Sequence, residues 1–166
     1  MQYVQGGRLP VWELGSCETD CMIGYHSVSV IADALMKGIE NIDVDLAIEA
    51  MIHSSNRKED SYFMKVNHHG KLEKSKFKND YIDVKSESES VSKSLEYAYN
   101  DWCIAQVIQK YKLEPKLDLA KWNDIYNEMM RRSNRWQHYL DPKTKYMRPK
   151  VNGEWLSPFE PREVNN

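Results

Sequence analysis

The feature that most constrains the fold is a long run of helical periodicity between residues 86 and 112. Ser86 and Glu89 have the spacing of a capping box, which places the start of a helix at Ser86. Pro115 follows the run, and proline is poorly tolerated inside a helix. Apolar side chains repeat at steps of three or four and form one stripe, at Val91, Leu95, Ala98, Trp102, Ala105 and Ile108. We therefore predict a single amphipathic helix over residues 86–112.

Three other segments have helical spacing. Residues 21–37 carry apolar side chains on one face and end at Gly38, a residue suited to the left-handed position after a helix. Asp43 is the predicted N-cap of the next helix, with Asp45 in its first turn, and residues 53–56 end it. Asp118 is the predicted start of a further helix. Its apolar side chains share one side, at Trp122, Ile125, Met129, Trp136 and Tyr139.

The segments between these helices differ in length and character. Residues 54–85 form a long irregular connection, with a short element predicted around residues 62–66. Loops of this length in compact domains are more often functional than accidental. Residues 141–144 have turn chemistry, and residues 146–155 are predicted to be a short strand or an extended segment. Without βαβ alternation or an internal repeat, the pattern predicts an all-α assembly.

Composition excludes several classes of protein. The net charge of −2 provides no basic footprint, so we expect no nucleic-acid partner. No apolar run approaches the ~20 residues of a membrane span. Three cysteines, an odd number, do not form a disulfide framework or a zinc pattern, and we interpret them as packing residues.

The ends of the chain also carry information. The first residues lack the basic and apolar regions of a signal peptide, so either the protein is cytosolic or its true N-terminus lies upstream. Neither end has the polar, low-complexity look of a natural tail. We therefore expect an internal piece of a longer protein.

Aromatic residues are abundant, with five Trp and ten Tyr. Such rings line carbohydrate or peptide sites, but they also pack helices together. Three stretches resemble signature segments of glycoside hydrolase family 92. They cover nearly the whole chain in matching order and spacing, at residues 7–14 with 18–26, residues 89–102, and residues 146–159.

The resemblance implies an (α/α)₆ toroid, of which residues 1–166 would form roughly half as one partial catalytic domain. It implies calcium-dependent, inverting, exo-acting hydrolysis of α-linked mannose, with α-1,2 linkages favoured, in a bacterial enzyme exported to the periplasm or cell surface. In the family pattern the general acid lies just past Asn166, and the base and most calcium ligands lie further on. The implied partners are α-mannoside glycans and the missing remainder of the catalytic domain. We expect the isolated chain to be inactive.

Under the same resemblance, substrate-binding candidates gather near the N-terminus, at Trp12, Glu13, Glu18, Asp20 and His26. Trp12 would stack on a sugar face or be buried in the core. Glu18 and Asp20 would bind sugar or cap the start of a helix. A lone histidine such as His26 is more often a hydrogen-bonded core residue than a catalyst.

Among the other carboxylates, Glu154 is the one candidate for a substitute general acid in this chain. The remaining carboxylates have simpler explanations. A retaining pair of carboxylates lies about 5–5.5 Å apart, and Glu13 and Glu18 could come that close around a turn, although nothing favours this over solvation. Asp101 follows Asn100 beside the apolar stripe, where a solvent-facing or helix-pairing role is the simpler interpretation.

Two alternative functions remain open. The chain would also suit a stand-alone α-helical interaction module without catalytic activity, whose aromatic stripes bury against a protein partner. A different (α/α)₆ glycosidase or lyase would have the same helices with other chemistry.

Overall fold

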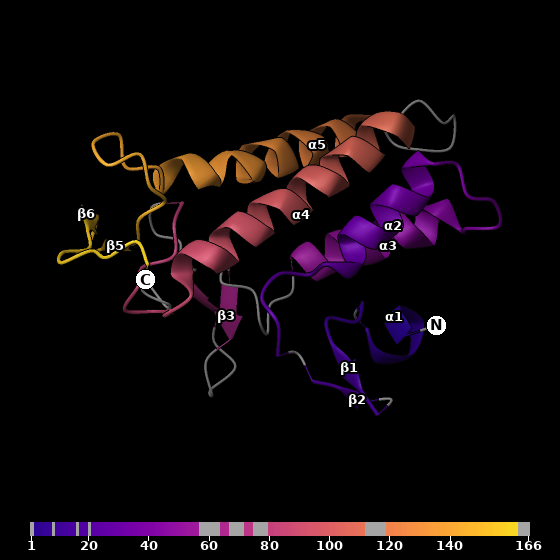
Figure 1. The fold of residues 1–166 in the computed structure, drawn as a ribbon. Helices are drawn as coiled ribbons and strands as arrows, with labels where there is room; N and C mark the ends of the chain where they lie inside the picture. Colours follow the sequence, from indigo (N-terminus) through magenta and orange to yellow (C-terminus); the bar gives the residue numbers. More distant parts are fainter. Residues whose placement is uncertain are drawn as a thin grey trace.

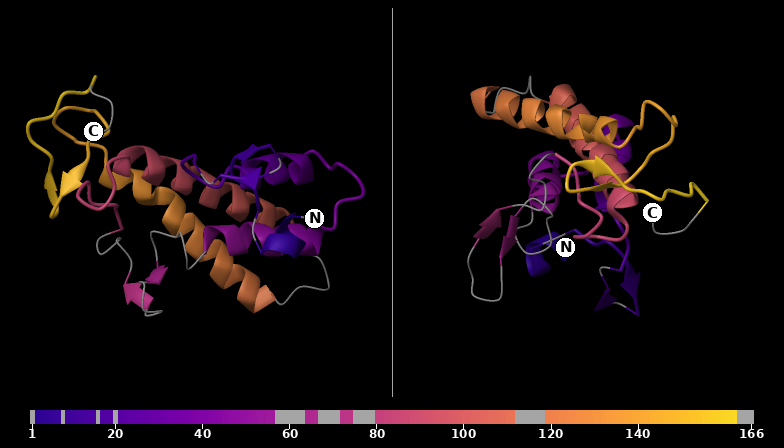
Figure 2. Two further views of the ribbon diagram at one scale, coloured as in Figure 1. Left: turned by 90° about the horizontal axis from the view of Figure 1, so that it is seen from below. Right: turned by 90° about the vertical axis from the view of Figure 1, so that its left-hand side faces the viewer.

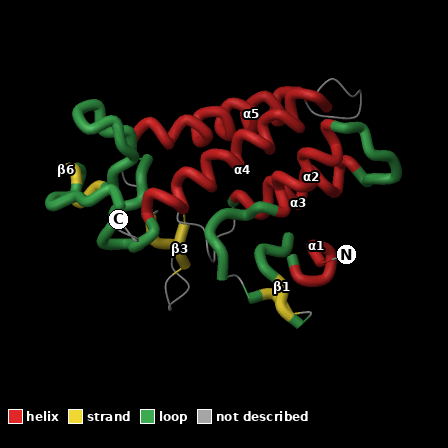
Figure 3. The backbone as a smooth tube through the Cα atoms, in the orientation of Figure 1, coloured by secondary structure: helices red, strands yellow, loops and turns green. Residues whose placement is uncertain are grey.

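The computed structural model describes residues 2–7, 9–15, 17–19, 21–56, 64–66, 72–74, 80–111 and 119–162. Most of them are helical, as the tube in Figure 3 shows. The main helices are α2 (Ser27–Met36), α3 (Val44–Ser55), α4 (Ser90–Tyr111) and α5 (Leu119–Ser133). A single-turn helix α1 (Gln2–Gly6) precedes them, and the 3₁₀ helix η1 (Asn134–His138) continues α5.

The strands in the described part of the chain form three small antiparallel pairs. These are β1 (Glu13–Leu14) with β2 (Cys17–Glu18), β3 (Met64–Val66) with β4 (Leu72–Lys74), and β5 (Lys150–Val151) with β6 (Glu154–Trp155). They lie at the edges of the molecule, and the β1–β2 and β5–β6 pairs are well apart (Figures 1 and 2). The prediction of a mostly helical chain with short extended elements is therefore confirmed.

Helix α4 is the centre of the packing. It lies along α5 on one side and against α2 and α3 on the other (Figure 1). The main core therefore collects apolar side chains from all four helices, namely Val28, Ala32, Leu35, Ile48, Met51, Cys103, Ile104, Ala105, Val107, Ile108 and Met129. Burial of a large aliphatic side chain stabilises a fold by about 1.5–3 kcal/mol. A second cluster joins Tyr81, Val91 and Tyr139 near the start of α4.

Two local predictions about helix ends are confirmed. The Asp43 carboxylate accepts a hydrogen bond from the amide of Leu46 at 3.0 Å and so caps α3. Gly38 follows α2 with φ of +72°, the left-handed conformation expected after a helix. Both features depend on residues within one turn, which explains why the local sequence predicts them. The turn at residues 141–144 is present as well, with the Asp141 carboxylate accepting from the Lys143 amide.

Three predicted helix boundaries are wrong. Helix α2 begins at Ser27 and not at residue 21, because Gly24 has φ of +81° and interrupts any helix through it. Helix α4 begins at Ser90 and not at Ser86, so the predicted capping box lies before the helix. Residues 83–86 form a turn there, and the amide of Glu89 donates to Glu87 Oε1 at 3.3 Å.

The third boundary concerns the predicted helix over residues 118–139. Its predicted cap, Asp118, lies outside the described residues. Helix α5 ends at Ser133, after which the chain tightens into η1 and carries Trp136 within it. The prediction of one uninterrupted helix to Tyr139 is therefore wrong.

The predicted apolar stripes are only partly buried. Trp102 is 45% exposed and Trp136 is 38% exposed, whereas Met129 and Tyr139 are buried. Trp102 projects from the side of α4 that its neighbours leave uncovered, because α5, α2 and α3 cover the others. Cys103 packs in the core as predicted, but Cys21 is exposed, which corrects the interpretation of that residue.

Candidate functional site

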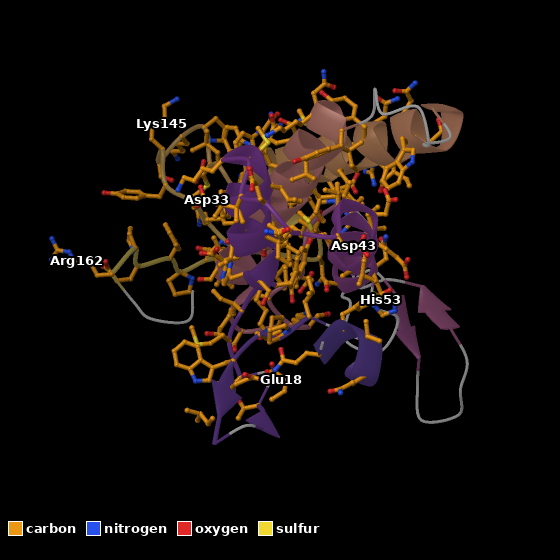
Figure 4. The ribbon with its side chains drawn as sticks, turned by 90° about the vertical axis from the view of Figure 1, so that its right-hand side faces the viewer. Glu18, Asp33, Asp43, His53, Lys145 and Arg162 are labelled. Atoms are coloured by element: carbon orange, nitrogen blue, oxygen red, sulfur yellow. The ribbon has the colours of Figure 1, made fainter. Side chains whose placement is uncertain are left out.

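The β1–β2 hairpin and the turn into α2 contain most of the predicted substrate-binding residues. In the hairpin, Glu13 pairs with Glu18 and Leu14 pairs with Cys17. Gly15 lies in the connecting turn with φ of +56°, a conformation that favours glycine. Figure 4 shows Glu18 on this hairpin, below the helical body.

The Glu18 carboxylate shapes the chain just before the hairpin. Its two oxygens accept hydrogen bonds from the amides of Val11 at 2.7 Å and Trp12 at 2.9 Å. The carbonyl of Trp12 in turn accepts from the amide and the hydroxyl of Thr19. These bonds hold the backbone of Trp12 on both sides, while its indole side chain is 47% exposed. The arrangement presents an aromatic ring from a well-anchored backbone.

The turn at residues 24–26 is held against α4. The amide of Tyr25 donates to Asn100 Oδ1 at 2.8 Å, and Asn100 Nδ2 lies 3.3 Å from Nδ1 of His26. A side chain at Gly24 would collide with the His26 ring, since a Cβ there would lie 2.8 Å from it. The Ser27 hydroxyl donates to the carbonyl of Pro10, which ties this turn to the segment that carries Trp12.

The turn at residues 24–26 also contacts a buried ion pair between Asp101 and Arg132. The Tyr25 hydroxyl donates to the Asp101 carboxylate, whose other oxygen lies 2.8 Å from Nε of Arg132. Arg132 also donates to the carbonyl of Ser55 and to Asn56 Oδ1, each at 2.8 Å. Burial raises the pKa of the Tyr25 phenol well above its usual range, and the Asp101 charge raises it further. Tyr25 therefore remains a hydrogen-bond donor at neutral pH. This ion pair confirms the helix-pairing interpretation of Asp101.

The structure brings some predicted site residues together and separates others. Trp12 and Glu18 are joined by a hydrogen bond, and His26 adjoins their segment through Ser27. Glu13 is exposed on the neighbouring strand. Asp20 lies outside the described residues. Glu154 is exposed on β6, in the C-terminal hairpin, well away from β1 (Figures 1 and 2).

Sequence reasoning missed three residues around this site. Asn100 holds both Tyr25 and His26, Glu96 Oε2 lies 3.4 Å from His26 Nε2, and Arg132 fixes Asp101. The polar pair at residues 100–101 within an apolar helix was a visible signal, since buried polar side chains need partners. Its partners lie far away in the sequence, however, so the sequence alone did not identify them.

The described residues do not supply a metal site. Within them, no three His, Cys, Asp or Glu side chains lie close enough together to hold a metal ion. Calcium prefers six to eight oxygen ligands, and no cluster of described His, Cys, Asp or Glu side chains supplies them. What the site offers is an anchored indole, a carboxylate bound by two amides, and an imidazole beside a second carboxylate. These groups suit hydrogen bonding and stacking to a polar ligand.

None of the described helices is both long enough and apolar enough to cross a membrane.

Comparison with known proteins identifies the chain. The glycosyl hydrolase family 92 catalytic domain matches residues 1–166. A protein of Arthroderma benhamiae named as an uncharacterized secreted glycosidase is 30% identical over 172 residues, covering 98% of this chain and 20% of that protein.

Two solved structures are also similar. A family GH92 α-mannosidase of Bacteroides thetaiotaomicron in complex with mannoimidazole has 36% identity and a TM-score of 0.73, covering 93% of this chain and 18% of that chain. A family GH92 inverting mannosidase of the same species has 28% identity and a TM-score of 0.75, covering 98% and 20%. The chain thus spans about a fifth of the length of these relatives. The chain therefore belongs to glycosyl hydrolase family 92.

Proposed function

We propose that the chain supplies helical scaffold and one wall of the sugar site in an exo-acting α-mannosidase. The observation that carries this proposal is the end-to-end match to the family 92 catalytic domain, together with 36% identity to an α-mannosidase. The reaction is inverting hydrolysis of α-linked mannose, with α-1,2 linkages as the substrate class, in a calcium-dependent enzyme. The four main helices form part of an (α/α)₆ toroid.

The wall consists of residues 9–26. Trp12 stacks on a sugar face and Glu13 contacts hydroxyl groups, with Asp20 and His26 in the same wall. Glu18 acts mainly through the backbone, because its oxygens accept from the amides of Val11 and Trp12. A sugar site needs such fixed polar and aromatic groups to set the orientation of its ligand.

The acid and the base of the reaction lie in other residues of the enzyme. An inverting glycosidase needs two carboxyl groups about 6.5–9.5 Å apart, with a water molecule on the far side of the sugar. Glu18 is bound by two amides, and Glu154 lies in the distant β5–β6 hairpin. The isolated chain accordingly does not hydrolyse α-mannosides, and we assign the acid and the base to segments that follow the matched region in the longer relatives.

A hybrid enzyme tests this proposal. The matched segment of the B. thetaiotaomicron α-mannosidase, which is 18% of that enzyme, is replaced by this chain. The hybrid is expected to hydrolyse an aryl α-mannoside, whereas the chain alone is not. The Trp12→Ala hybrid is expected to lose most of the activity. A hybrid that unfolds cooperatively and binds mannoimidazole but lacks hydrolysis, or turnover by the isolated chain, would overturn the proposal.

The enzyme is exported from the cell. The support is the name of the fungal relative, which describes a secreted glycosidase. Fractionation of the native organism, with activity measured in the cytosolic and exported fractions, tests this point. Recovery in the cytosolic fraction alone would contradict it.

A second candidate function is a stand-alone interaction module. It is favoured by the stacked pair Tyr99 and Trp102 on α4, whose exposed fractions are 50% and 45%. In the leading proposal Trp102 of this pair packs against the remainder of the catalytic domain. Oxidative footprinting of Trp102 separates the two cases: protection in the hybrid but not in the isolated chain supports the catalytic domain as its partner.

A further inference from the structure

The orientation of the Asn100 side chain follows from its contact with Tyr25. A backbone N–H can only donate, so the Asn100 atom that lies 2.8 Å from the Tyr25 nitrogen is the carbonyl oxygen. The amide nitrogen of Asn100 then faces Nδ1 of His26 at 3.3 Å. Asn100 is completely buried, so no solvent competes for these two bonds.

This orientation determines where the proton of neutral His26 lies. An amide NH₂ group can only donate, so Nδ1 of His26 must be the acceptor and carries no proton. The proton of the neutral ring is therefore on Nε2. Nε2 lies 3.4 Å from Oε2 of Glu96, so the protonated nitrogen of the ring is the one beside this carboxylate. A Cβ at residue 24 would lie 2.8 Å from the ring, so the glycine there leaves room for the ring in this position.

Nδ1 of His26 is thus bonded to Asn100, and Nε2 lies beside the Glu96 carboxylate. The Glu96 side chain remains 40% exposed, and the His26 side chain is 39% exposed. A carboxylate held through one oxygen can accept a ligand hydroxyl with its other lone pairs, and such charge-assisted bonds are strong. Tyr99 follows one helical turn later with a half-exposed ring, so an aromatic face adjoins this carboxylate.

We infer that Glu96 contacts ligand hydroxyl groups at this site, and that His26, oriented by Asn100, is the positioning residue for Glu96. The ligand class is a sugar with free hydroxyls, and this inference rests on the proposed function. The contact with ligand hydroxyls is thus made by Glu96 on α4, and not by an imidazole nitrogen of His26 on the N-terminal wall.

The first experiment needs no ligand. Nitrogen-15 NMR of the His26 ring in the 166-residue chain reports which nitrogen carries the proton. The expected result is the Nε2–H tautomer. Asn100→Asp keeps an acceptor for Tyr25 but removes the donor to Nδ1, so the proton is expected to move onto Nδ1. Asn127→Asp, at an exposed position on α5, is the control and should leave the ring unchanged. An Nδ1–H tautomer in the wild-type chain would overturn the inference, whether or not the variant folds.

The second experiment tests the contact with a ligand. Methyl α-D-mannoside is titrated into the chain while the NMR signals of His26, Tyr99 and Trp12 are followed. Glu96→Gln keeps an acceptor for His26 but removes the charge, and we expect about tenfold weaker binding. The matched control is Glu40→Gln, at an exposed position after α2, which should bind like the wild type.

The outcomes separate this inference from the proposed function. If the mannoside shifts Trp12 equally in the wild type and in Glu96→Gln, the role of Glu96 is wrong and the proposed function stands. If the mannoside shifts no residue of the site, both the Glu96 contact and the proposed function are contradicted. In that case, the tautomer measurement still reports on the Asn100–His26 arrangement by itself.

Discussion

The Nε atom of Arg132 lies 2.8 Å from the carboxylate of Asp101, and the two side chains are only 3% and 1% exposed. This ion pair joins α5 to α4. It also reaches the end of α3 through the carbonyl of Ser55 and reaches the turn before α2 through the Tyr25 hydroxyl. One buried interaction thus fixes the helices relative to the segment that carries the proposed sugar wall.

Removal of one residue of the Asp101–Arg132 ion pair should strongly destabilise the chain. Asp101→Ala leaves the Arg132 charge buried without its main partner, and we expect a loss of about 3–5 kcal/mol in the free energy of unfolding. The control is Asp33→Ala, which breaks the exposed pair with Lys37 and should cost less than about 1 kcal/mol. Urea unfolding of both variants measures the difference. Equal, small losses would show that the ion pair does not organise the helices.

The Asp141 carboxylate should make stability depend on pH in the acid range. Burial alone would raise its pKa, but bonds from the Lys143 amide, the Arg148 guanidinium and the Thr144 hydroxyl outweigh this and lower it to about 2. An unfolded aspartate has a pKa of about 3.9. The stabilisation is therefore complete above about pH 4 and is lost as the pH falls toward 2.

Asp141→Asn tests this dependence. The wild type should be more stable than the variant at neutral pH, and the gap should close as the pH falls through that window. Thermal or urea unfolding at a series of pH values measures the gap. A gap that stays constant down to the lowest pH would contradict the assignment of the low pKa.

Gly24 should tolerate substitution less well than Gly15. Both residues have positive φ, at +81° and +56°, so a Cβ strains the backbone by about 1–2 kcal/mol at either position. Only at Gly24 would the Cβ also meet a neighbour, the His26 ring at 2.8 Å, since the space around Gly15 is open. Gly24→Ala should therefore lower the free energy of unfolding more than Gly15→Ala and should alone shift the His26 NMR signals. Identical effects would mean that the ring is not held against the turn.

The local sequence determined some elements, and distant contacts determined others. Asp43 and Gly38 were predictable because the cap and the left-handed residue depend on neighbours within one turn. The start of α2 was mispredicted, because the chain before Ser27 is not helical. Gly24 has a positive φ there, and the Tyr25 amide donates to Asn100, a residue far away in the sequence. Trp102 was assigned to the apolar stripe, but its side chain is partly exposed. Periodicity does not reveal which side of α4 the other helices leave uncovered.

The candidate site was predictable only in part. The N-terminal wall was proposed from the resemblance to family 92, and helical periodicity did not point to it. Glu96 and Asn100 were missed because a polar residue on a long helix normally indicates a solvated face. Their role depends on His26, which reaches α4 only in the folded chain.

Glu18 should be needed for the order of the hairpin. Glu18→Gln replaces one carboxylate oxygen by an NH₂ group, which can only donate, so either Val11 or Trp12 loses its acceptor. Amide hydrogen exchange at these two positions should accelerate by about fivefold or more, as expected for a bond worth ~1 kcal/mol. Glu13→Gln, on the exposed paired strand, is the matched control and should leave both rates unchanged. Unchanged rates in Glu18→Gln would show that its carboxylate does not hold the segment.

The most direct test of the central claim, that residues 9–26 form a wall of a mannose site, is an NMR titration with mannoimidazole. This compound is bound in the structure of the B. thetaiotaomicron relative. Signal shifts in fast exchange detect even the weak binding expected of a partial site. The account predicts shifts centred on Trp12 and His26, and their loss in Trp12→Ala. The absence of shifts up to the solubility limit, or shifts confined to the β5–β6 hairpin, would contradict it.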